Sequence, residues 1–170
     1  MIIREVTLKD IDALVELSKT TFFDTYGAKN TAADMEHYLE TNFSKTVLCS
    51  ELRDVNVFFY FLELENENVG YLKLNVGSAQ TELKDAKSLE IERIYLKKAY
   101  QGKGLGLQLL KKAIAVGKEK AVTYIWLGVW EENPKAIQFY KKNGFEVFDT
   151  HTFLLGSDIQ TDFMMRLNLK

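Results

Sequence analysis

Apolar runs predict a short first strand and three longer strands between the start of the chain and Leu96. Met1–Val6 is the short strand. Asn56–Glu65 and Val69–Val76 are rich in aromatic and β-branched residues and flank the polar turn Asn66-Glu67-Asn68. This arrangement predicts a β-hairpin. Leu89–Leu96 is a further strand-type run, and the polar segment before it is expected to be a loop.

Helical spacing of apolar residues predicts two helices and a shorter third one between the first strand and the hairpin. Thr7 and Thr31 are each followed three residues later by an aspartate, a capping signature that marks a helix start. The first stripe runs through Phe22, and the pattern breaks near Tyr26-Gly27. A third, short helix is expected from Ser44 onwards.

The second half of the chain predicts an alternation of helices and strands. A long helix follows a glycine-rich turn and ends near Lys120, and Asn143-Gly144 is a stop signal for the next helix. Together with the first half, this order predicts an α/β (α+β) fold in a single domain spanning residues 1–170. The remaining predicted elements are a strand Val122–Trp130, a helix Asn133–Lys142, and closing strands Phe145–Phe153 and Asp162–Leu169 around Gly156-Ser157-Asp158.

Composition narrows the class of protein. The 170 residues are 46% hydrophobic and 27% charged, as in ordinary globular proteins, and the net charge of −2 argues against a nucleic-acid partner. A single cysteine, Cys49, excludes an internal disulfide, and His37 and His151 are too isolated to predict a metal site. No apolar run is long enough to span a membrane, so a cytoplasmic protein is expected.

The most informative segment is the turn Gln101-Gly102-Lys103-Gly104-Leu105-Gly106, between the strand Leu89–Leu96 and the long helix. Glycines let the backbone approach a ligand, and the first turn of a helix presents free N–H groups to an anion. A Walker A loop would need Ser or Thr after Lys103. A dinucleotide fingerprint would need Gly or Ala at Leu107 or Leu109. The pattern Q/R-x-x-G-x-G/A remains, and Gln101, Gly104 and Gly106 satisfy it.

A second motif follows the predicted strand that ends at Trp130. The segment Asn133–Phe145 reads N-x-x-A-x-x-x-Y-x-K-x-G-F. With the glycine turn upstream, it resembles the GCN5-related N-acetyltransferase (GNAT) superfamily. The order of predicted elements also matches that family, so the resemblance covers the whole chain. It implies a mixed, mostly antiparallel central sheet flanked by helices.

The resemblance implies acetyl-CoA as co-substrate, with no metal, and a direct attack by the acceptor in a ternary complex. Backbone N–H groups of the glycine turn would hold the pyrophosphate, lysines would add charge, and the strand end would pair with the pantetheine. Asn133 would fix the cofactor arm near the thioester. The expected cofactor-binding residues are Ile94, Tyr95, Leu96, Gln101, Gly102, Lys103, Gly104, Leu105, Gly106, Asn133, Lys135, Tyr140 and Lys142.

Acetyl transfer to an amine needs a base for the ammonium proton and an acid for the departing thiolate. Glu90 and Glu92 are expected to share a face of their strand with Ile94 and Leu96, and two nearby carboxylates raise each other's pKa. Either glutamate could relay the proton, while the other could be structural and pair with Arg93 or a lysine. By resemblance, Tyr140 is the acid; the alternative is a core aromatic residue.

A finer resemblance is to the bacterial PaiA-type spermidine/spermine N-acetyltransferases. The segments LEIERIY, IWLGVWE, FYKKNGF and FFDTYG carry it, together with Gln160-Thr161-Asp162 near the end of the chain. It implies a polyamine acceptor and an acidic groove, for which Asp24 and Glu36 are the expected substrate-binding residues. The sequence leaves open another amine acceptor, such as a protein amino terminus, an amino acid or a drug, and a non-catalytic acyl-CoA-binding regulator. It also leaves room for a homodimer.

Overall fold

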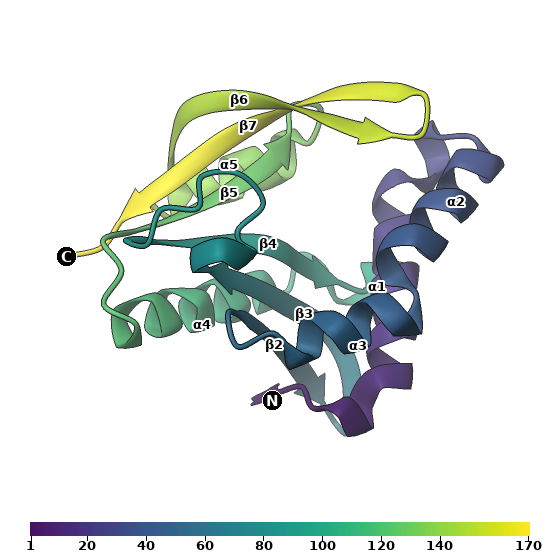
Figure 1. Cartoon of the computed structure of the whole chain (residues 1–170), viewed down its shortest axis with the longest axis horizontal. Helices are drawn as coiled ribbons and strands as arrows, with labels where there is room; N and C mark the ends of the chain where they lie inside the picture. The colour runs from purple at the N-terminus through teal and green to yellow at the C-terminus, as the bar shows by residue number, and fades with distance from the viewer.

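The computed structural model describes residues 1–170, apart from the side chain of Asp158. The backbone forms a seven-stranded sheet with helices on both faces (Figure 1). The strands are β1 (Ile2–Glu5), β2 (Val57–Leu64), β3 (Glu67–Val76), β4 (Ser88–Leu96), β5 (Tyr124–Trp130), β6 (Glu146–Leu155) and β7 (Asp158–Asn168). The helices are α1 (Ile11–Tyr26), α2 (Ala32–Phe43), α3 (Lys45–Arg53), α4 (Leu105–Glu119) and α5 (Pro134–Lys142).

The strand order is β1-β2-β3-β4-β5-β7-β6. All neighbours are antiparallel except β4 and β5, which are parallel and pair only through Ser88–Glu90 and Tyr124–Trp126. The prediction of a mixed, mostly antiparallel sheet flanked by helices is confirmed. β4 and β5 stop pairing after these three residues, and the cleft of the functional site lies where the two strands separate.

Two apolar cores cover the two faces of the sheet. Leu109, Leu110 and Ala113 of α4 are fully buried against one face, where Tyr140 of α5 also packs. Leu14 of α1 and other residues of α1–α3 form the core on the opposite face. Figure 1 shows α4 on one side of the sheet and α1–α3 on the other, with the β6–β7 hairpin extending until its tip reaches α2. None of the described helices has the length and apolar character needed to cross a bilayer.

A β-bulge in β4 changes which residues share a face. Lys73 of β3 pairs with Arg93, but the next residue of β3, Leu74, pairs with Ile91, so Glu92 is an extra residue. The alternation therefore shifts by one position at this point. Glu90 and Glu92 do share a face, as expected. The expectation that Ile94 and Leu96 lie with them is wrong: these two pack in the core beneath α4.

The predicted elements are otherwise found, with shifted boundaries. Thr7 donates from its backbone N–H to the Asp10 side chain over 2.8 Å, but the first turn is a 3-10 turn and α1 begins at Ile11. The short third helix is present as α3. The last strand begins at Asp158 rather than at Asp162, since hairpin pairing with β6 continues through polar residues.

Candidate active site

The site is a cleft of about 660 Å³ that opens where β4 and β5 cease to pair. Residues of the glycine turn, of the end of β4 and of α5 line one end, and residues of α1 and β5 line the other, together with Glu92 of β4. Both predicted motifs therefore meet in one cavity. It is lined by Thr25, Tyr26, Ile91, Glu92, Ile94, Tyr95, Leu96, Gln101, Gly102, Gly104, Gly106, Leu107, Leu127, Gly128, Val129, Trp130, Asn133, Lys135, Ala136, Phe139 and Tyr140.

The glycine turn has the geometry of an anion cradle. Gly102 and Gly104 have φ angles of 74° and 77°, in the left-handed region that favours glycine. A Cβ built on either residue would meet nothing within 4 Å, so the backbone faces open space. Gly104 is the N-cap of α4, and the first N–H groups of this helix have no partner within the helix. The turn therefore fits the pyrophosphate of coenzyme A.

Most of the expected cofactor residues line this end of the cleft. They include Gln101, whose side-chain amide donates to the backbone oxygen of Leu96 over 3.2 Å, and Asn133, whose Oδ1 caps α5 by accepting from the Ala136 N–H over 3.2 Å. Lys135 lines the cleft as well.

Three expected cofactor residues do not line the cleft. Lys103 is exposed, with its Nζ 5.4 Å from the centre of the Tyr100 ring, and Lys142 is exposed in the last turn of α5. Leu105 is half-buried at the first position of α4.

Tyr140 of α5 also lines the cleft. The residue is buried, its ring packs against Phe139 and Phe145, and its hydroxyl makes no hydrogen bond to another described residue. Burial raises the pKa of its phenol well above the usual value, with a smaller contribution from Tyr26. The group therefore keeps its proton at neutral pH and can act as a donor.

Glu90 is buried and does not line the cleft. Thr81 binds both of its carboxylate oxygens: the backbone N–H donates to Oε2 over 2.8 Å and the hydroxyl donates to Oε1 over 2.5 Å. The Asn75 amide donates to Oε2 over 3.0 Å. Burial raises the pKa of Glu90, and the hydrogen bonds from Thr81 and Asn75 oppose this without cancelling it.

Glu92 lines the cleft and belongs to a buried ionic network. Its carboxylate lies 2.6 Å from Lys73 Nζ and 3.0 Å from Arg93, and both cations also contact Glu51 of α3. Burial alone would raise the pKa of Glu92, but the charges of Arg93 and Lys73 outweigh burial and hold the pKa below its usual value. The two glutamates share the Asn75 amide, yet their pKa values move in opposite directions.

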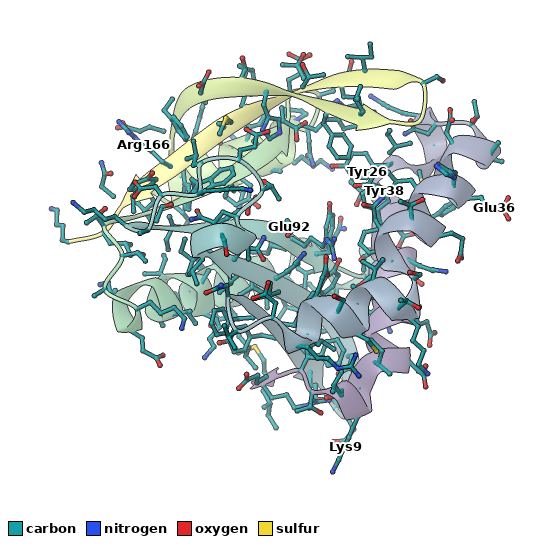
Figure 2. The ribbon with its side chains drawn as sticks, in the orientation of Figure 1. Lys9, Tyr26, Glu36, Tyr38, Glu92 and Arg166 are labelled. Atoms are coloured by element: carbon teal, nitrogen blue, oxygen red, sulfur yellow. The ribbon has the colours of Figure 1, made fainter. Side chains whose placement is uncertain are left out.

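The end of the cleft opposite the glycine turn is walled by aromatic rings. Tyr26 lines it, and its ring centre lies 5.7 Å from Trp130 and 6.2 Å from Phe153. The Tyr38 ring lies 5.9 Å from Phe153. Figure 2 shows Tyr26 and Tyr38 on the inner side of the helices, towards Glu92. This end can surround a cation with π faces and the carboxylate of Glu92.

The structure does not bring Asp24 or Glu36 into the cleft. Both side chains are exposed, and Figure 2 shows Glu36 on the outer side of α2. The reason is helical spacing: Thr25 and Tyr26 follow the buried pair Thr21 and Phe22 by four residues and so continue the inner face of α1, whereas Asp24 does not.

Sequence reasoning missed several residues at this end, most notably Tyr26, Gly128 and Trp130. The four-residue spacing from Phe22 was a usable signal for Tyr26. For Gly128, a glycine inside an apolar strand indicates a close approach by another group, and His151 does approach it there.

Comparisons with known proteins agree with this geometry. The Acetyltransferase (GNAT) family model matches residues 11–145. An uncharacterized N-acetyltransferase in the pepI 3' region of Lactobacillus delbrueckii subsp. lactis is 44% identical over 162 residues, which cover 95% of this chain and 94% of the relative. Spermidine N(1)-acetyltransferase of Thermoplasma acidophilum is 28% identical over 160 residues, covering 92% of each chain.

The same architecture recurs among solved structures. That of PaiA N-acetyltransferase from Thermoplasma acidophilum in complex with coenzyme A has a TM-score of 0.82 and 27% sequence identity, and the match covers 99% of this chain and 98% of that one. The resemblance stated from the sequence, including its PaiA-like character, is confirmed. The chain belongs to the acetyltransferase (GNAT) family and is an N-acetyltransferase that uses acetyl-CoA.

Proposed function

We propose that this enzyme acetylates a primary amine of a polyamine such as spermidine or spermine. The observation that carries the proposal is the composition of the acceptor end, by which we mean Thr25, Tyr26, Glu92, Gly128 and Trp130 of the cleft. It combines aromatic faces with a carboxylate at the mouth of a cavity whose other end fits coenzyme A. Aromatic faces and carboxylates are the groups that recognise alkylammonium ions. Two relatives are named as spermidine and probable spermine acetyltransferases, which supports the same substrate class.

The chain's own residues divide into a binding set and a proton-handling set. Acetyl-CoA supplies the acetyl thioester. The glycine turn would hold the pyrophosphate. Beyond its bulge, β4 is not paired with β5, and its residues Ile94–Leu96 would orient the pantetheine along the cleft.

Two side chains are assigned to proton transfer. An alkyl ammonium has a pKa of about 10 and must lose a proton before its nitrogen can attack. We assign this proton to Glu90, reached through water, because its raised pKa makes it the better base of the two glutamates. Glu92 is then a fixed negative charge at the cleft wall. The Tyr140 hydroxyl is the proton donor for the departing sulfur.

Thr81→Val tests the assignment of the base. The variant keeps the backbone hydrogen bond to Glu90 and removes the one from the hydroxyl, which stabilises the ionised form. The pKa of Glu90 should therefore rise further, and the acidic limb of the kcat/KM profile should move to higher pH by about one unit. Thr81→Ser should restore the original limb. A limb that stays in place in Thr81→Val excludes Glu90 as the titrating base.

Steady-state kinetics test the acceptor class. With acetyl-CoA saturating and thiol release as the signal, kcat/KM should be far higher for spermidine and spermine than for a monoamine of similar length. The ratio should fall as salt is added, because salt screens the approach of a polycation to the acidic cleft more than that of a monoamine, with a Debye length of about 10 Å at 0.1 M. Equal efficiency for all amines, without a salt effect, would contradict the polyamine proposal and leave the acetyltransferase assignment intact.

A further inference from the structure

Asp162 of β7 carries a buried carboxylate oxygen with no partner. The residue is 9% exposed, and Oδ1 is buried without a hydrogen-bond donor among the described residues. Only Oδ2 is engaged, 3.3 Å from His151 Nε2. Buried carboxylate oxygens are nearly always hydrogen-bonded, so an orphan of this kind indicates that a donor belongs there.

Asp162, His151 and Glu82 form a cluster that holds more negative than positive charge. His151 of β6 lies between two carboxylates, with Nε2 near Asp162 and Nδ1 2.7 Å from Glu82 Oε1. The hydrogen bond to Asp162, and then the contact with Glu82, raise the pKa of His151, although burial opposes them. Even when protonated, His151 carries one positive charge against two carboxylates. A further positive charge would therefore be stabilised here.

Asp162 adjoins the acceptor end of the cleft. Gly128, which lines the cleft, has no side chain to separate it from this group: a Cβ there would lie 3.1 Å from His151 Cε1 and 3.4 Å from Asp162 Oδ2. The negative charge of Asp162 also acts on Tyr26, which lines the cleft. Burial, and then the charge of Asp162, raise the pKa of Tyr26 to about 12.

We propose that Asp162 binds the second, non-reacting ammonium group of the acceptor, with Oδ1 as the accepting atom and Tyr26 and Trp130 as flanking rings. The inference rests on the proposed function and adds to it the residue that selects polyamines over monoamines. His151 and Glu82 are positioning residues: they hold Oδ2 and leave Oδ1 to the ligand. The missing side chain of Gly128 also leaves the ligand chain a path to Asp162.

Asp162→Asn tests the proposal directly. The variant keeps the shape of the side chain but removes its charge, so the ratio of kcat/KM for spermidine to kcat/KM for a monoamine of similar length should fall about tenfold. The loss should appear mainly in KM for spermidine. Glu119→Gln, which removes one exposed negative charge from the end of α4, should leave the ratio unchanged.

Gly128→Ala is the second variant, because it narrows the path to Asp162 without altering any charge. This variant should also lower the ratio of kcat/KM for spermidine to kcat/KM for the monoamine. If Asp162→Asn does not fold, the result with Gly128→Ala alone tests the proposal. An unchanged ratio in either folded variant overturns the proposal and gives Oδ1 to a bound water. If the unaltered enzyme acetylates no amine at all, the proposed function fails instead.

Discussion

Tyr140→Phe should lower kcat by about 10²-fold while the dissociation constant for coenzyme A stays nearly unchanged. The substitution removes one hydroxyl and keeps the ring that packs against Phe139 and Phe145. Because burial keeps the phenol protonated, this hydroxyl is a proton donor throughout the neutral range. Without it, the sulfur must leave as an unprotonated thiolate or take its proton from water.

The measurement is kcat at saturating acetyl-CoA and acceptor, with calorimetry for the binding of coenzyme A. Tyr60→Phe is a matched control, since Tyr60 is a buried tyrosine of β2 outside the cleft. If kcat of Tyr140→Phe equals that of the unaltered enzyme, Tyr140 is a packing residue, which is the alternative left open by the sequence.

The second large effect is expected from Gly104→Asp, which should weaken the binding of coenzyme A by about 10²-fold or more. Gly104 has a φ of 77°, a conformation that costs a residue with a Cβ about 1–2 kcal/mol. The new carboxylate would also enter the open space that the turn leaves for the pyrophosphate. Strain and like-charge repulsion therefore act together.

Two further variants separate these causes. Gly104→Ala retains the strain and adds no charge, so its loss of affinity should be smaller. Gly77→Asp introduces the same side chain at another glycine of positive φ, outside the cleft, and should leave the affinity for coenzyme A unchanged. Calorimetry with coenzyme A gives all three values. An unchanged dissociation constant for Gly104→Asp would remove the glycine turn from the cofactor site.

The cofactor end of the site could be predicted from the sequence because its parts are local. The turn Gln101–Gly106 is one contiguous segment in which Gly102 and Gly104 adopt positive φ angles. Asn133 is a helix cap that also lines the cleft. Each motif can be recognised in the sequence without knowing which residues face it across the cavity. The strands and helices were predictable for the same reason, since each depends on spacing within a single segment.

The acceptor end could not be predicted in this way because distant segments assemble it. Tyr26 comes from α1, Glu92 from β4 and Gly128 from β5, and nothing in the local pattern of one indicates the others. Exposed acids such as Asp24 and Glu36 look equally suitable in the sequence, and only the direction of each helix face separates them from the cleft.

The pKa values of the two glutamates could not be predicted from the sequence either. The sequence placed Glu90 and Glu92 on one face and predicted mutual elevation of their pKa values. In the structure the pKa of Glu90 is raised and that of Glu92 is lowered, because Lys73 of β3 and Arg93 contact Glu92 and do not contact Glu90. The bulge that presents Glu92 to the cleft arises from pairing with β3, and it is not visible in β4 alone.

A competition assay tests the central claim most directly. The enzyme is incubated with acetyl-CoA and an equimolar mixture of spermidine and a monoamine of similar length, and the products are identified by mass spectrometry. We predict that spermidine gains one acetyl group on a primary amine while the monoamine remains almost unmodified. Equal acetylation of the two amines, or acetylation of the monoamine alone, would contradict the account.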